Sequence, residues 1–252
     1  MDFNIKKPLH ILALLMIIAS FFVIIILPIL SFFEVFPSSG SVDTQEIQNL
    51  SSNTKLIFEI ILLVVQLSFV IVLMVFFPIL WYLMVNGCSF KEILSRMKLK
   101  LKGFNMAFLW GILAAVLMFA LVFVFEIILI MLGVHSEELG NIQDIETYFS
   151  PVSILIILAV QPMAEEIFFR GFLFDKISSF GGGYIAIVLT AVLFGLAHMS
   201  YSKPYLVVSI IMMGVVLGCI VVKTKNLYSA IVAHTTFNVT SFILYILAKS
   251  LM

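Results

Sequence analysis

Residues 9–33 read LHILALLMIIASFFVIIILPILSFF, a run of 25 positions without Lys, Arg, Asp or Glu. As an α-helix rising 1.5 Å per residue, it would extend about 37 Å, enough to cross a hydrocarbon core roughly 30 Å thick. Lys6 and Lys7 precede the run, as basic residues precede the apolar part of a signal peptide. However, that part spans only about 7–15 residues, and no cleavage site of the A-x-A type follows here. The stretch therefore predicts a retained transmembrane helix.

The composition of the whole chain extends this prediction. Of the 252 residues, 63% are hydrophobic and only 11% are charged, whereas a soluble domain has about 25% charged residues. So few charges cannot cover a water-facing surface, so the lipid bilayer must surround most of the chain. The formal net charge is zero, and without a basic excess we expect no nucleic-acid partner. Cys88 and Cys219 lie far apart in the sequence and are predicted to be free thiols.

The pattern of apolar runs predicts an all-α fold, a polytopic membrane bundle of about seven transmembrane helices. The predicted spans are roughly 9–33, 56–85, 104–132, 151–178, 183–201, 205–222 and 227–248. We divide the chain into residues 1–149, which hold the N-terminal spans and a basic loop, and residues 150–252, which hold the polar motifs. Both belong to a single integral membrane domain.

Charged residues in the loops predict the orientation, because cytoplasmic loops are rich in Lys and Arg. The basic loops alternate with acidic ones along the chain. The largest basic group is Lys91, Arg96, Lys98, Lys100 and Lys102, and the third loop carries Glu137, Glu138, Asp144 and Glu146. This alternation predicts a multi-pass membrane protein with the N-terminus cytoplasmic and the C-terminus outside. The richness in Phe, Ile and Leu with little Ala is typical of an AT-rich bacterial source, so we expect a bacterial cell membrane.

Three short segments place ionisable or amide side chains at predicted membrane depth, where each charge costs about 2.5–3.5 kcal/mol on insertion scales. The first contains Glu165, Glu166 and Arg170. Glu166 and Arg170 are four residues apart and can pair on one helix face, while Glu165 points about 100° away. Pro162, just upstream, is expected to kink the helix.

The other two segments place His198 in the fifth predicted span, and His234 and Asn238 on one face of the last. Taken singly, each of the three segments has an ordinary explanation: an ion pair, an interfacial histidine or hydrogen bonding between helices. Their depths in the membrane favour a shared site instead. Glu165 and His198 lie about 24–26 Å along their helices from the glycine turn at 181–183. His234 and Asn238 lie roughly 14 and 20 Å from the next turn, which is on the same side of the membrane. We therefore expect these side chains to converge in one buried layer.

Small residues are spaced for close helix packing. Gly214 and Gly218 form one small-xxx-small pair, and Ala191 and Gly195 form another. Such pairs allow helix backbones to approach each other, which predicts contacts involving the fifth and sixth spans.

The three motifs, Glu165-Glu166-x-x-x-Arg170, Phe194-x-x-x-His198 and His234-x-x-x-Asn238, resemble the signature motifs of the CAAX-protease and bacteriocin-processing (CPBP) family. That family covers CAAX prenyl endoproteases of the Rce1 type and bacterial Abi proteins linked to bacteriocin self-immunity. The resemblance covers roughly residues 150–245. It implies an intramembrane endopeptidase that hydrolyses a peptide bond of a membrane-associated peptide or protein.

By that resemblance, Glu165 is the general base that activates water and His198 helps to hold it. His234 and Asn238 stabilise the oxyanion, and Arg170 pairs with Glu166 to fix the helix. A carboxylate in a desolvated cavity gains proton affinity, and amide or imidazole donors aimed at an oxyanion supply much of the catalysis in hydrolases. We expect no cofactor, since no H-E-x-x-H motif is present. The alternative is a zinc ion held by His198, His234 and Glu165.

Two other functions fit part of the sequence. One is a non-catalytic immunity or scaffold protein that binds a bacteriocin or a sensor protein. Against this function, all positions of the three motifs are filled by the residue types of the family. The other is a transporter with a polar site at the midplane, for which no inverted repeat or discontinuous helix pair is visible. The sequence names neither the substrate nor the oligomeric state.

Overall fold

The computed structural model describes residues 3–35, 51–134, 145–199 and 204–251. Within these ranges the chain folds as helices joined by turns and short loops, and six helical stretches are long and apolar enough to cross a membrane. The predicted class, a polytopic helical bundle, is confirmed. Glu137, Glu138 and Asp144, on which part of the orientation argument rests, lie outside the described residues.

The helices follow one another in chain order, several of them continuous with a π-helical segment (η). They are α1 (Pro8–Phe21), η1 (Phe22–Ile26), α2 (Leu27–Phe32), α4 (Ser52–Ile71), η2 (Val72–Phe76), α5 (Phe77–Met84), α6 (Phe90–Arg96), α7 (Phe104–Met131), α9 (Pro151–Glu166), η3 (Ile167–Leu173), α10 (Phe174–Leu196), α11 (Pro204–Thr224) and α12 (Tyr228–Leu251).

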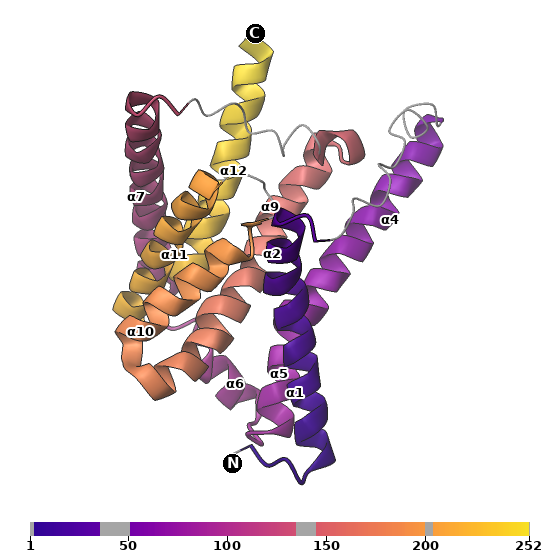
Figure 1. The fold of residues 1–252 in the computed structure, drawn as a ribbon, viewed down its shortest axis with the longest axis vertical. Helices are drawn as coiled ribbons and strands as arrows, with labels where there is room; N and C mark the ends of the chain where they lie inside the picture. Colours follow the sequence, from indigo (N-terminus) through magenta and orange to yellow (C-terminus); the bar gives the residue numbers. More distant parts are fainter. Residues whose placement is uncertain (1–2, 36–50, 135–144, 200–203, 252) are drawn as a thin grey trace.

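The fourth and fifth predicted spans form one helical stretch, Pro151–Leu196, interrupted at Gly182. Gly182 has φ 76° and ψ 177°, a backbone conformation that essentially only glycine adopts. The chain reverses there, so the second half of α10 runs back beside η3 and packs on α11 (Figure 1). The six stretches therefore hold the seven predicted segments, although the arm after Gly182 has only 14 helical residues before α10 ends at Leu196.

Proline explains the π-helical segments of the first two spans. Pro28 and Pro78 are each the second residue after such a segment, and proline has no N–H to donate to the carbonyl four residues back. The turn widens, so the N–H of Leu27 reaches the carbonyl of Phe22, five residues back. The third π-helical segment, η3, follows the acidic motif, and Pro162 lies inside α9 just before that motif. Arg170 thus lies in a widened turn that begins five residues after Pro162, and the kink expected at Pro162 itself stays a prediction.

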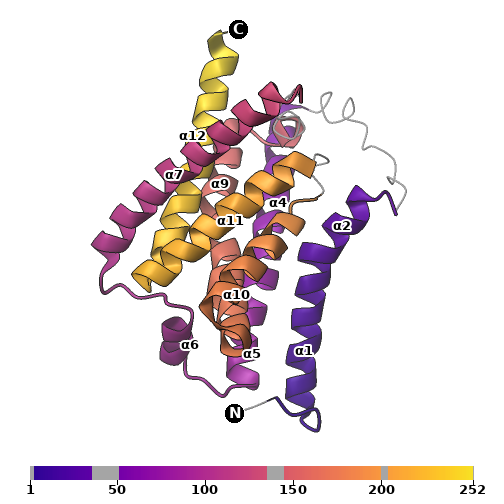
Figure 2. The same cartoon turned by 60° about the vertical axis from the view of Figure 1, so that its left-hand side comes forward.

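Close packing of α10 on α11 depends on the small residues that the sequence singles out. A Cβ atom on Gly214 would lie 3.0 Å from Ala191, and one on Gly218 would lie 3.2 Å from Ile187. On the other side of the bundle, α12 lies between α7 and α9 (Figure 2). The N- and C-termini lie at opposite ends of the molecule (Figure 1). This placement fits an odd number of crossings, while the assignment of each end to a side of the membrane remains a prediction.

Candidate active site

A buried ion pair forms the centre of the polar layer. Nη1 of Arg170 donates a 2.8 Å hydrogen bond to Oε1 of Glu166, and both side chains are fully buried. Nη2 of Arg170 donates to the carbonyl of Gly214 on α11 at 3.2 Å, and the guanidinium lies 4.4 Å from the centroid of the Phe194 ring. Because Gly214 has no side chain, the guanidinium can approach this carbonyl. Arg170 thereby ties η3 to both α10 and α11.

His234 joins this pair from the last helix. Its Nδ1 lies 2.9 Å from Oε1 of Glu166, and its Nε2 lies 3.8 Å from Oε2 of Glu165. An ionised carboxylate only accepts hydrogen bonds, so Nδ1 of His234 carries a proton and donates this hydrogen bond to Glu166. One glutamate therefore holds both Arg170 and His234. Its second oxygen, Oε2, is buried and has no hydrogen bond to any described residue.

Glu165 lies in a different environment from Glu166. Its Oε1 accepts a 2.8 Å hydrogen bond from the side-chain amide of Gln161, and no cation of the described residues lies within ion-pair distance except His234. Glu165 also lines a cavity of about 190 Å³, while Glu166 does not. As the sequence predicts, the two adjacent glutamates face different partners, and only one of them borders open space.

His198 reaches the same cavity from the end of α10. Its Nδ1 lies 2.7 Å from the backbone carbonyl of Phe194. A carbonyl only accepts, so Nδ1 is the donor and Nε2 is the acceptor nitrogen of the neutral ring. The Phe194 ring lies between the polar groups, with centroids 4.7 Å from the His198 ring and 5.5 Å from the His234 ring.

The structure thus brings together Glu165, Glu166, Arg170, His198 and His234 from α9, η3, α10 and α12. The bend within α10 reaches further toward its end of the bundle than the start of α12 does (Figures 1 and 2). This offset compensates for the shorter distance of His234 from its own turn. Asn238 lies one helical turn beyond His234, half-buried, and makes no hydrogen bond to another described residue.

Several residues of the site are absent from the sequence-based predictions. Gln161 bonds Glu165 and lies 3.4 Å from Gln66 of α4. Its spacing of four residues before Glu165, on a membrane helix, is the signal that could have identified it. The first two spans also form one wall of the cavity, which is largely apolar. From these spans the cavity is lined by Val23, Ile24, Pro28, Phe69, Val70, Leu73 and Met74.

The alternative of a zinc ion requires its predicted ligands, His198, His234 and Glu165, to lie close together with free donor atoms. In the described parts of the chain, no three His, Cys, Asp or Glu side chains converge closely enough to hold a metal ion. Nδ1 of His234 is engaged by Glu166, and Nδ1 of His198 by a backbone carbonyl. As placed, these residues do not form a zinc ligand set, so we derive no reaction step through a metal.

Comparison with known families agrees with this geometry. Residues 147–240 match the family described as type II CAAX prenyl endopeptidase Rce1-like. This part of the chain is similar to that family. The match begins just before α9 and ends in α12, so it includes all three polar motifs, and the resemblance drawn from those motifs is confirmed. The Rce1-like region supports an intramembrane protease of the CAAX type in general. No curated protein and no solved structure matches the chain.

Proposed function

We propose that this protein is an intramembrane endopeptidase in which Glu165 activates water for attack on a peptide bond. The observation that supports this proposal is that the two neighbouring glutamates have different partners. Glu166 is bound by Arg170 and His234, whereas Glu165 borders the cavity and, among the described residues, accepts a hydrogen bond only from Gln161. A general base must be able to accept a proton, which Glu165 can do because no basic side chain in the described part of the chain is hydrogen-bonded to it. Glu166, bound to Arg170 and His234, holds the neighbouring helices in position.

In the proposed reaction, water between Glu165 and His198 loses a proton to Glu165 as its oxygen attacks the carbonyl carbon of the substrate. Nε2 of His198 accepts a hydrogen bond from the second O–H of the water and so orients the attack, and that hydrogen stays on the attacking oxygen. The C–N bond then breaks as Glu165 returns its proton to the leaving amine. The products are one carboxylic acid and one amine, and no oxidant or co-reactant is needed.

The tetrahedral intermediate requires hydrogen-bond donors for its oxyanion. Asn238 supplies amide N–H groups, in the role that the family resemblance gives it. His234 can donate through Nε2 only when doubly protonated, because Nδ1–H already serves Glu166.

We propose a membrane-associated peptide or protein as the substrate. The cavity beside Glu165 has an apolar wall from η1, α2, α4 and η2, which suits an apolar segment next to the scissile bond. The chain-reversing arm after Gly182 carries His198 and completes the site.

The first experiment compares the peptides of cells that produce wild-type protein with those of cells that produce Glu165→Ala. A peptide found only with wild type then serves as substrate for purified variants. Glu165→Gln keeps the size and polarity of the side chain but removes the base, so turnover should fall by at least about a thousandfold. Full activity of Glu165→Gln would exclude Glu165 as the base.

Glu126→Gln is the matched control, because Glu126 also lies within a membrane-spanning helix, α7, away from the site. It should retain wild-type turnover. A zinc chelator added to wild-type enzyme tests the alternative mechanism: loss of turnover that zinc restores would make His198 and His234 ligands. Binding of the peptide without cleavage by wild type would favour the non-catalytic immunity or scaffold function.

A further inference from the structure

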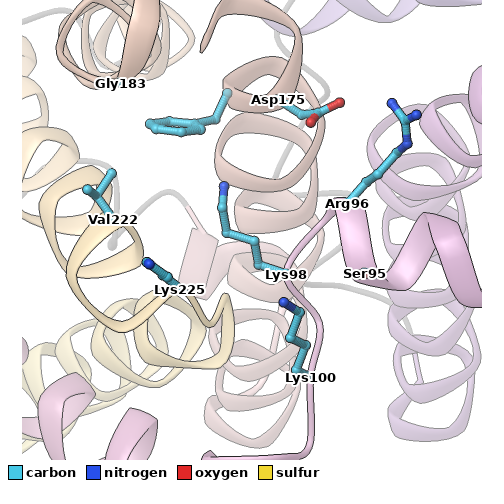
Figure 3. A pocket seen from close by; sticks show the side chains of 9 residues that line it. Ser95, Arg96, Lys98, Lys100, Asp175, Gly183, Val222 and Lys225 are labelled. Carbon is cyan, nitrogen blue, oxygen red and sulfur yellow. The ribbon is translucent and has the colours of Figure 1, made fainter. Parts of the chain in front are cut away.

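A second cavity, of about 400 Å³, lies at the end of the bundle that holds the N-terminus and α6. Four basic side chains line it, and a single acidic one, Asp175. Figure 3 shows them arranged around the opening: Arg96, Lys98 and Lys100 come from α6 and the segment after it, and Lys225 from the turn between α11 and α12.

Asp175, the one acidic residue among those that line this basic cavity, already interacts with Tyr82 and Lys176. Oδ2 of Asp175 accepts a 2.7 Å hydrogen bond from the hydroxyl of Tyr82 and lies 3.7 Å from Nζ of Lys176. Asp175 therefore cannot neutralise the four cations around the cavity. The excess of positive charge calls for an anion from outside the chain.

Positive residues near helix ends are common on the cytoplasmic side of membrane proteins, but two of these have an unusual backbone. Lys98 has φ 58° and Lys225 has φ 52°. Each follows the end of a helix, α6 or α11, where the left-handed conformation usually belongs to glycine or asparagine. A lysine at such a position is strained, and strained residues cluster at ligand-binding sites.

Hydrogen bonds hold the two lysine-bearing segments together. The N–H of Leu227 donates to the carbonyl of Lys98 at 2.9 Å, and the side-chain amide of Asn226 donates to the carbonyl of Lys100 at 2.9 Å. The basic residues are thus fixed on a joined pair of loops. Nζ of Lys98 lies 4.4 Å from the centroid of the Phe174 ring, and burial lowers the pKa of this lysine. A bound anion would offset that cost of burial.

The depth of the cavity indicates where the anion comes from. Its lining includes Gly183, next to the Gly182 turn, and two aromatic side chains flank this turn, Phe180 with 92% of its surface exposed and Tyr184 with 89%. Exposed aromatic residues at helix ends are typical of the membrane–water interface. The basic cavity therefore lies at the level of lipid headgroups, and basic pockets of this kind bind anionic headgroups.

We propose that this cavity binds the phosphate of an anionic phospholipid headgroup, with Lys98 and Lys225 as the principal cations. The site is separate from Glu165 and does not depend on the peptidase proposal. The lipid would join the α6 segment to the α11–α12 turn, from which α12 carries His234 into the candidate active site.

The test uses full-length protein in nanodiscs of equal phosphatidylglycerol and phosphatidylcholine, with retained lipids counted by native mass spectrometry. Wild type should retain phosphatidylglycerol preferentially. The double variant Lys98→Asn with Lys225→Asn should reduce that retention at least fivefold. Asparagine suits the left-handed conformation, so this variant should keep or raise the unfolding temperature, which is measured in parallel.

The matched control is Lys91→Gln with Lys102→Gln, which also removes two positive charges, both from the segment around α6 and at exposed positions outside the cavity. It should retain phosphatidylglycerol like wild type. Equal loss in both double variants, or no preference in wild type, would overturn the proposal in favour of diffuse attraction. A rise in unfolding temperature with inorganic phosphate in phosphatidylcholine discs, without phosphatidylglycerol retention, would also overturn it and indicate a free-phosphate site.

Discussion

The Glu166–Arg170 pair offers a sharp test of how the candidate site is held together. Both side chains are fully buried and joined at 2.8 Å, and Glu166 also receives Nδ1–H of His234. Glu166→Gln preserves the shape but leaves the guanidinium without its nearest counter-charge. Removing one partner of a buried ion pair typically costs about 3–5 kcal/mol. The folding equilibrium constant should therefore fall roughly 150-fold to 5,000-fold.

The same reasoning predicts partial recovery when the orphaned charge is removed as well. Glu166→Gln combined with Arg170→Met leaves no unpaired guanidinium, so the double variant should be more stable than Glu166→Gln alone. The assay is reversible unfolding in mixed micelles, with helix content followed by circular dichroism. Glu146→Gln is the control, because it breaks a 2.6 Å contact with Lys249, whose side chain is 60% exposed. A surface pair contributes about 1 kcal/mol or less.

Equal stability of Glu166→Gln and wild type would refute this account, since it would mean that the buried guanidinium needs no carboxylate. Greater stability of Glu166→Gln than of the double variant would refute it too. Turnover is measured on the same samples, because this role of Glu166 predicts loss of both stability and activity, whereas Glu165→Gln should lose activity alone.

Four further outcomes are expected. Asn238→Ala should lower turnover about 10²–10³-fold with KM little changed, as measured by steady-state peptide cleavage, if its amide serves the oxyanion. Gly214→Val should destabilise the protein by about 1–3 kcal/mol in the unfolding assay, because its side chain would collide with α10. A cysteine replacing Glu138 should react with a membrane-impermeant thiol reagent in intact cells, and labelling only after lysis would contradict the predicted orientation. Hydrogen bonds from Ser89 hold the pKa of Glu92 below its usual value, so the α6 capping box stabilises the folded state above the unfolded pKa, and this stabilisation is lost as the pH falls through the lower folded value. The protection of the α6 amides against hydrogen exchange, corrected for the intrinsic exchange rate at each pH, should fall accordingly, and Glu92→Gln should abolish this pH dependence.

The sequence alone determined the membrane character and the helical class, because these depend on composition and on the length of apolar runs. Residues 9–33 need no partner to specify a spanning helix, since a bilayer imposes internal hydrogen bonding on any segment that crosses it. The pairing of Glu166 with Arg170 was also predictable, as it depends on a local spacing of four residues. The three glycines at 181–183 likewise predicted the turn at which the chain reverses.

Tertiary structure decided which charges meet and what surrounds them. That Nδ1 of His234 bonds Glu166 and its Nε2 faces Glu165 follows from the rotation and depth of α12, which packing against α7 and α9 fixes. The cavity wall supplied by the first two spans, and the gathering of Lys98 and Lys225 at one opening, join segments far apart in the chain. Sequence spacing sets positions along a helix, but contacts between helices depend on side-chain packing that local patterns do not encode.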